Sequence, residues 1–119
     1  MKAFKLINIS ETDCSFEEGT ITESVNIDAN FFVIKTTFEP YQLTPHPAPR
    51  YQFVVTLKGK LKFTVSNGSS FIIEPGVMLI AKDTKGSGHS WEILEGNEWE
   101  RIYIVPDLDA EDLFIPKIL

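Results

Sequence analysis

The stretch YQFVVTLKGKLKFTVSNGSSFIIEPGVMLIA, residues 51–81, alternates short runs of β-branched and aromatic residues with residues typical of turns. The turns are Lys58-Gly59-Lys60, Ser66-Asn67-Gly68-Ser69 and Pro75-Gly76. Glycine and asparagine supply the positive φ angles of tight hairpins, and proline removes a ladder donor. We therefore expect hairpins at the first two turns, and at Pro75-Gly76 a crossing between layers of strands.

The same pattern extends to both sides, whereas no helical repeat of apolar residues runs through the chain. The expected strands are Phe4–Ile9, Ile21–Ile27, Phe31–Phe38, Tyr51–Leu57, Leu61–Val65, Ser70–Ile73, Met78–Ala81, Ser90–Leu94 and Trp99–Val105. Glu95-Gly96-Asn97 predicts a third hairpin, and the first twenty residues a flap or an edge. One helical turn is expected to start at Asp109, before an apolar C-terminal segment that docks. So many short strands with corners predict a sandwich or barrel.

Composition narrows the class of protein. A chain of 119 residues that is 43% hydrophobic predicts one domain, 1–119, with its own core. A net charge of −6 argues against nucleic acid or an anionic membrane as partner. Without a secretion leader or a run of about 18 apolar residues, we expect a cytoplasmic protein. The single Cys14 cannot form an intrachain disulfide, and its acidic neighbours indicate an inert thiol.

The motifs of several enzyme classes do not occur, among them the nucleophile elbow, the phosphate loop and the paired-cysteine zinc signature. The two histidines each lie beside a strand corner. His46 precedes the strand at 51–57, and His89 lies near the end of the glycine-rich segment KDTKGSGHS. Imidazole is a common metal ligand, but His46 is equally explained by a hydrogen bond to a backbone carbonyl.

Residues 40–106 resemble the cupins, which are small conical β-barrels that carry two short motifs. The first motif is His-x-His, three or four residues, Glu, six residues and Gly. Counted back from Gly59, it places His46 at the first His, Ala48 at the second and Gln52 at the Glu. The second motif resembles Pro75-Gly76 followed by His89, with Ile93 where Asn is often found.

A narrower resemblance is to small single-domain bacterial cupins of unassigned function. It rests on HPAPRxQ at residues 46–52 and DTxGxGH at residues 83–89. Val77 and Lys82 depart from the Asp and Glu expected in many relatives, which indicates a divergent member.

The resemblance implies an all-β, antiparallel double-stranded β-helix, an RmlC-like jelly roll of six to ten strands with little helix. It also implies one divalent ion, of Fe, Mn, Ni or Zn, held by His46, Gln52 and His89. Ala48 cannot bind a metal and Gln52 lacks a carboxylate, so the site is degenerate and its affinity should be lowered. The aromatic surplus and the resemblance together predict a homodimer.

Arg50 needs an anion or several acceptors inside such a barrel. It either bridges to Asp83 and pins the late loop, which is slightly favoured, or binds a ligand carboxylate beside Gln52 and the histidines. Both can hold at once. Alternation places Trp91 on the same strand face as His89, as a pocket wall or as core, and places Tyr51, Phe53 and Val55 on a face that packs layers or subunits.

Three functions follow from these residues. The first is a small-molecule binding or sensing protein whose acidic or polar ligand, such as a carboxylate, contacts Arg50, Gln52, Asp83, His89 and Trp91. The second is a metal-assisted enzyme of isomerase or dioxygenase type, with the metal at the positions His46, Gln52 and His89 that the resemblance assigns. The third is a structural or interaction cupin whose barrel is occluded. The sequence leaves open whether the protein is an enzyme.

Overall fold

The structure is a computed structural model that describes residues 1–118. Nearly all of its regular structure is β, with one short 3-10 helix. The elements are β1 Lys2–Asn8, β2 Cys14–Ile21, β3 Ala29–Lys35, η1 Pro40–Leu43, β4 Gln52–Thr64, β5 Ser70–Ile73, β6 Met78–Ala81, β7 Ser90–Pro106 and β8 Phe114–Pro116. The all-β fold with little helix is thereby confirmed.

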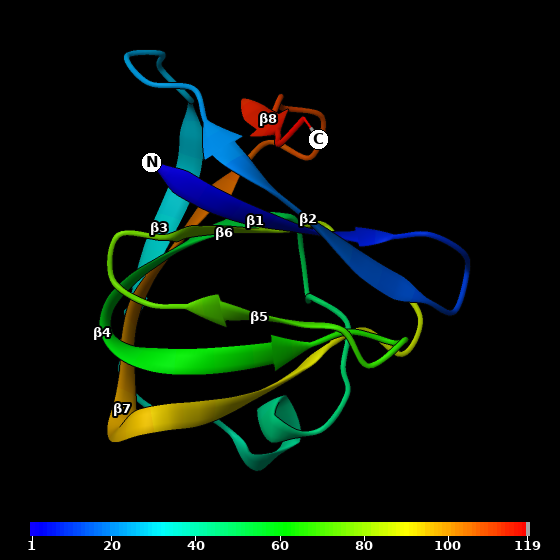
Figure 1. The fold of residues 1–119 in the computed structure, drawn as a ribbon. Helices are drawn as coiled ribbons and strands as arrows, with labels where there is room; N and C mark the ends of the chain where they lie inside the picture. The colour runs from blue at the N-terminus through cyan, green and yellow to red at the C-terminus, as the bar shows by residue number, and fades with distance from the viewer. Residues whose placement is uncertain (119) are drawn as a thin grey trace.

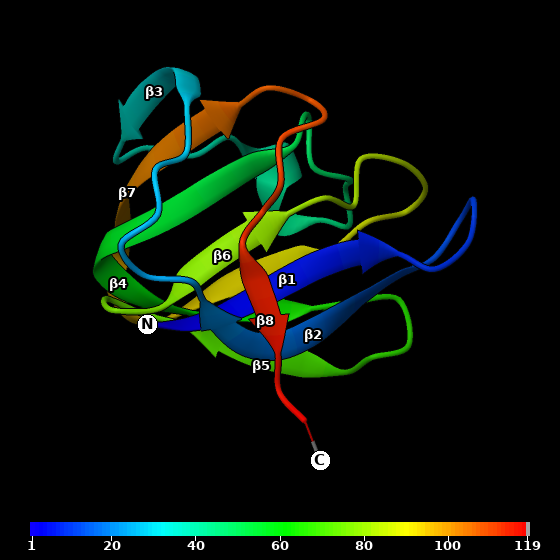
Figure 2. The same cartoon turned by 90° about the horizontal axis from the view of Figure 1, so that it is seen from above.

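The strands form one strongly curled sheet in the order β3-β7-β4-β6-β1-β2-β8, and β5 pairs with β4 (Figures 1 and 2). The ladders are antiparallel except for β1 with β6, which run parallel. That pair departs from the expected purely antiparallel arrangement. The curl encloses the inner face of the sheet, where the larger part of the core lies.

β4 and β7 are long strands that bend together, which corrects two of the expected hairpins (Figure 1). Residues 58–60 and 95–97 lie inside β4 and β7, and the β4–β7 ladder shifts register three times between Thr56 and Leu61. Gly59 adopts a φ of +114° at this bend, and a Cβ there would lie 2.7 Å from the Glu98 carbonyl oxygen. The glycine therefore serves a bulged corner in a continuous strand.

The remaining turn predictions in this stretch are confirmed. Residues 66–69 close the β4–β5 hairpin, in which the Val65 amide donates to the Ser69 carbonyl at 3.0 Å. Pro75-Gly76 connects β5, which pairs with the second half of β4, to β6, which pairs with the first half of β4. The chain thus crosses between the two ends of β4 at this point.

The predictions for the two ends of the chain were partly wrong. Residues 14–21, which were expected in a flap or edge segment, form strand β2. Of the strand expected over 21–27, only Ile21 lies in a strand. β1 lies within the sheet between β6 and β2, because both of its edges find partners. Residues 107–113 form a turn and loop in place of the expected helical turn. β8 pairs with β2, which confirms that the C-terminal segment docks.

Two faces of the sheet carry two apolar clusters, as the alternation predicts. The inner cluster contains Val54, Leu61, Phe63, Leu79, Trp91, Trp99 and Tyr103, among others. The outer cluster is built on Tyr51, Phe53 and Ile80. Across residues 1–118, no helix has the length and apolarity needed to cross a membrane.

Candidate ligand pocket

A cavity of about 100 Å³ lies on the inner face of the curled sheet, beneath η1 and the loop that follows it. A cavity of this volume suits only a small organic ligand. The lining residues are Lys35, Tyr41, Gln42, His46, Ala48, Pro49, Arg50, Gln52, Val54, Phe63, Leu79, Ala81, His89, Trp91, Trp99 and Tyr103. Among the residues described, no aspartate or glutamate lines it.

Two loops meet at the cavity through a reciprocal backbone pair. The His46 amide donates to the His89 carbonyl, and the His89 amide donates to the His46 carbonyl, both at 2.9 Å. Gly88 allows this approach, because a Cβ at its position would lie 2.0 Å from the His46 carbonyl oxygen. Its φ of +70° also favours glycine. The two histidines, 43 positions apart, are therefore brought together by the backbone.

The late loop is also fixed on its other side, against the β1–β2 turn. The Ser87 amide and hydroxyl both donate to the Thr12 carbonyl, at 3.0 and 2.9 Å. The Asn8 side chain donates to the Lys85 carbonyl at 2.8 Å. This anchoring places His89 at the wall of the cavity with little freedom to move.

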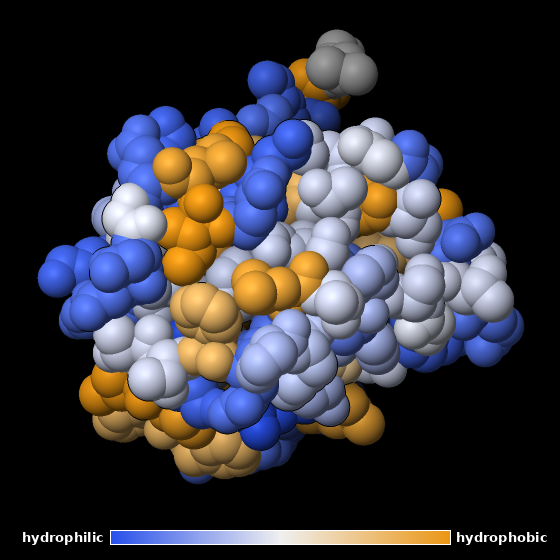
Figure 3. Space-filling model, turned by 90° about the horizontal axis from the view of Figure 1, so that it is seen from below, coloured by the Kyte–Doolittle hydropathy of each residue, from blue (hydrophilic) through white to orange (hydrophobic). Residues whose placement is uncertain are grey.

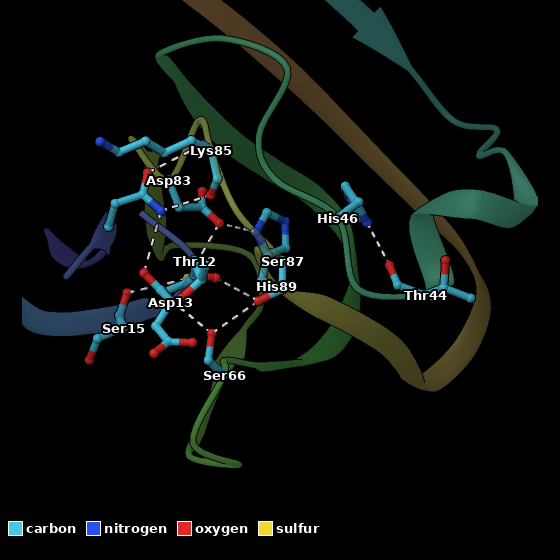
Figure 4. A network of polar contacts seen from close by, with 12 residues as sticks. Thr12, Asp13, Ser15, Thr44, His46, Ser66, Asp83, Lys85, Ser87 and His89 are labelled. Atoms are coloured by element: carbon cyan, nitrogen blue, oxygen red, sulfur yellow. Dashed lines mark hydrogen bonds and ion pairs between the residues drawn. The ribbon is translucent and has the colours of Figure 1, made fainter. Parts of the chain in front are cut away.

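A buried carboxylate orients His89. The Nδ1 of His89 lies 2.5 Å from Oδ2 of Asp83, a residue with no exposed surface (Figure 4). The Cys14 thiol contacts the same oxygen at 3.4 Å. Burial raises the pKa of this thiol and the nearby carboxylate raises it further, in agreement with the expected inert cysteine. With Nδ1 engaged, Nε2 is the nitrogen that His89 can offer to a ligand.

His46 is held differently. Its Nδ1 lies 2.8 Å from the Thr44 carbonyl, on the side away from Asp83 (Figure 4). Burial lowers the pKa of His46, although the bond to Thr44 opposes this effect. The neutral ring therefore donates from Nδ1 and keeps Nε2 as an acceptor. The two imidazole centroids are 4.8 Å apart, so one small ligand can touch both rings.

Arg50 does not form the favoured bridge to Asp83, and this expectation was wrong. No ion pair joins these two side chains in the described part of the chain, because Asp83 is committed to His89. Arg50 instead donates from Nε to Oε1 of Gln52 at 3.1 Å and lies 5.3 Å from the centroid of Phe31. Asp83 holds the late loop through its backbone, since its carbonyl accepts from the Ala48 amide at 2.9 Å.

The other predicted residues also adjoin the cavity. Gln52 is buried at the start of β4 and lines the cavity with Arg50. Trp91 is both wall and core, since it lines the cavity and packs edge-on against Trp99 with centroids 4.9 Å apart. Asp83 is the exception, because it lies behind His89 and outside the lining.

Sequence reasoning missed several polar residues near the cavity, among them Tyr41 and Gln42 of η1, which line it. Lys35 and Tyr103 line it, and Arg101 lies between Trp99 and Tyr103 on β7 with no exposed surface. Alternation along Trp99–Val105 would have placed Arg101 on the inner face, and this was the usable signal.

The donor set does not fit the divalent ion that the cupin resemblance implies. Residues 1–118 contain no group of three or more His, Cys, Asp or Glu side chains placed to hold a metal. The Gln52 oxygen already accepts from Arg50, so a positive charge stands beside the third expected ligand. Lys35 adds a second cation to the same lining. These charges favour an anion over a cation.

Comparison with known proteins gives no matching family model, no similar curated protein and no similar solved structure.

Proposed function

We propose that the chain is a cupin-like jelly-roll protein that binds a small carboxylate-bearing molecule in its barrel pocket. The observation that carries the proposal is the charge of the lining. Lys35 and Arg50 are cationic, two histidines stand beside them, and no acidic side chain of residues 1–118 lines the cavity. The whole protein has a net charge of −6, so this local excess of positive charge runs against its composition.

Arg50 is the main anchor. Its Nε is bonded to Gln52, and its Nη groups have no hydrogen-bond partner among the residues described. Guanidinium groups bind carboxylates through two parallel hydrogen bonds, and Gln52 fixes the orientation from which these can form. Phe31 supports the guanidinium from one side.

The histidines and Trp91 complete the contact surface. Asp83 and Thr44 engage the two Nδ1 atoms, so both rings present Nε2 to the ligand. The neutral His46 ring keeps Nε2 as an acceptor, so it accepts from a hydroxyl of the ligand, whereas the carboxylate needs the donors of Arg50. Trp91 provides an apolar wall, as small-molecule pockets combine apolar surface with a few placed polar groups.

A thermal-shift screen of short carboxylic acids tests this proposal. A ligand at one hundred times its Kd stabilises a protein by about 2.7 kcal/mol, which raises the melting temperature measurably. We expect Arg50→Ala to abolish that rise and Lys58→Ala, an exposed control at the β4 bend, to retain it. A rise that persists unchanged in Arg50→Ala would refute the role of Arg50.

Elemental analysis separates binding from metal-assisted catalysis. Protein purified without chelator or metal resin is loaded with iron, manganese, nickel or zinc and analysed, beside His89→Ala. We expect no stoichiometric metal, because Arg50 and Lys35 repel a cation at this lining. Stoichiometric metal that is lost in His89→Ala would favour an enzyme instead.

We further propose that the chain assembles as a homodimer through the outer face of β3. Apolar side chains gather in surface patches, some of which Figure 3 shows. On the outer face of edge strand β3, Phe32 is 66% exposed and Ile34 63% exposed. They pair in the ladder with Ile104 and Ile102 of β7, which extends the apolar surface. A large exposed apolar patch at a sheet edge favours self-association.

Light scattering at micromolar concentration tests the assembly. The wild-type protein should have the mass of a dimer, and Phe32→Lys with Ile34→Lys should have the mass of a monomer. A wild-type monomer would refute the proposed dimer without bearing on the pocket.

A further inference from the structure

Arg101 is a buried cation that lacks an anionic partner in the described chain. Its side chain has no exposed surface, and no carboxylate of residues 1–118 forms an ion pair with it. Its guanidinium carbon lies 4.4 Å from the ring centroid of Trp99 and 5.3 Å from that of Tyr103. Nη1 donates to the Trp99 carbonyl at 2.8 Å, and Nη2 has no partner among the residues described. Such burial is costly unless something supplies negative charge.

A ligand in the cavity can supply this negative charge, because Tyr103 links the cavity to Arg101. Trp99 and Tyr103 lie on either side of Arg101 on the inner face of β7, and both line the cavity. The Tyr103 hydroxyl accepts from Arg101 Nε at 2.8 Å. A hydroxyl has one proton to donate, and no residue between 1 and 118 accepts it. A donor bonded to a cation is a stronger donor to the next oxygen, because hydrogen bonds in a chain polarise one another.

We infer that Tyr103 donates a hydrogen bond to a second negatively charged oxygen of the ligand, and that Arg101 orients and strengthens this donor. The inference rests on the proposed carboxylate binding and names the ligand class as short dicarboxylates or acids with a second oxyanion. Tyr103 is the contacting residue, and Arg101 is a positioning residue that acts through it.

The placement of the two anchors supports two separate anionic groups. Arg50 precedes β4, whereas Tyr103 pairs with Val54, two residues beyond Gln52 in that strand. One carboxylate at Arg50 therefore leaves Tyr103 to a different group of the same molecule. The volume of about 100 Å³ restricts the spacer to very few carbons.

Calorimetric titration with malonate and with acetate tests the inference, because the two probes differ by one carboxylate. A hydrogen bond to a charged group strengthens binding by at least about tenfold. We therefore expect malonate to bind at least about tenfold more tightly than acetate. Tyr103→Phe, which keeps the ring, should remove this preference by weakening malonate binding much more than acetate binding.

The Arg101 variants provide a second readout. Arg101→Met should lose the malonate preference, and Arg101→Lys, which keeps a cation beside Tyr103, should restore part of it. A purely structural role would lower both affinities together and leave their ratio unchanged. Circular dichroism of each variant establishes that it is folded.

The outcomes separate this inference from the proposed function. If Tyr103→Phe binds malonate as the wild type does, the role of Tyr103 is overturned, while Arg50-dependent carboxylate binding stands. If wild-type protein binds both probes equally, the second anionic subsite is overturned. If neither probe binds wild-type protein, the proposed function fails and this inference fails with it.

Discussion

His89 and Arg101 are two basic side chains buried beside one cavity, and the protein compensates them in opposite ways. His89 is 6% exposed, and Arg101 is fully buried. His89 has a carboxylate, Asp83, at 2.5 Å. Arg101 has two aromatic rings, a hydroxyl and a backbone carbonyl, all of them neutral.

The difference separates a group that stabilises the fold from a group that serves ligand binding. The Asp83–His89 pair is closed within the protein, so it fixes the ring and the late loop whether or not a ligand is bound. The Arg101 group is open toward the ligand through Tyr103. A closed pair should matter most for stability, because removing one partner leaves the other buried and unsatisfied. An open group should matter most for binding.

Gly88→Ala should lower the unfolding free energy most, because Gly88 lies in the loop that carries the Asp83–His89 pair. Its Cβ would fall 2.0 Å from the His46 carbonyl oxygen, so the backbone must move and the two His46–His89 hydrogen bonds would be lost. Two bonds of about 1 kcal/mol and a strained φ together predict a loss of at least about 3 kcal/mol in unfolding free energy.

Gly96→Ala is the matched control, since Gly96 has a φ of +78° but no atom within 4 Å of its added Cβ. It should cost about 1 kcal/mol in chemical denaturation. Equal losses in the two variants would show that conformation, and not the loop contact, decides the effect.

Asp83→Ala should lower the unfolding free energy by about 2 kcal/mol, because it leaves His89 Nδ1 buried without its acceptor. The other carboxylate oxygen, Oδ1, has no partner among residues 1–118, which moderates the loss. Asp83→Asn retains an acceptor oxygen and should recover part of the stability. Identical urea midpoints for wild type and Asp83→Ala would contradict the closed pair.

Asp112 extends the comparison to a carboxylate with two cations. Its Oδ2 lies 2.7 Å from Lys5 Nζ and 3.1 Å from Lys82 Nζ. Burial acts to raise the pKa of Asp112, but hydrogen bonds from Lys5, the Phe114 amide and Lys82 outweigh it and lower the pKa to about 2.

A pKa that is lower in the folded state means that the unfolded chain binds the proton more tightly. The stabilisation, about 2 kcal/mol, is therefore full above pH 4 and is lost as the pH falls toward 2. Urea unfolding at pH 5 and pH 2.5 should show this loss in wild type and much less of it in Asp112→Asn. A parallel fall in both proteins would assign the acid sensitivity to other groups.

Much of this fold was predictable because period-two alternation and turn residues report local backbone geometry. The hairpin at residues 66–69 needed no more than that. The corners at Gly59 and Gly96 were read as hairpins, since a glycine with positive φ serves a tight turn and a bulge equally well. Which one forms depends on whether the ladder continues, and that is a property of the partner strand.

The site divides in the same way. His46 and His89 could be placed together from their motifs, but the partners of Asp83 and Arg50 could not. The sequence shows which acidic and basic residues are present. Which acidic residue pairs with which basic residue depends on side-chain distances that the sequence does not contain. Arg101 was not singled out, because a cation inside a core is rare without a carboxylate.

Arg101→Met gives the smallest expected change in stability. It also distinguishes most clearly between the closed Asp83–His89 pair and the open Arg101 group. The substitution removes a buried charge and replaces it with an apolar chain of similar length, an exchange that is often neutral or stabilising. It leaves the Tyr103 hydroxyl and the Trp99 carbonyl without their donor, which offsets part of the gain. We expect the unfolding free energy to change by less than about 1 kcal/mol. A loss of 3 kcal/mol or more would place Arg101 with Asp83, as a closed structural group. A small change in urea denaturation, beside a lost preference for malonate, would mean that this cation is retained for the ligand and not for the fold.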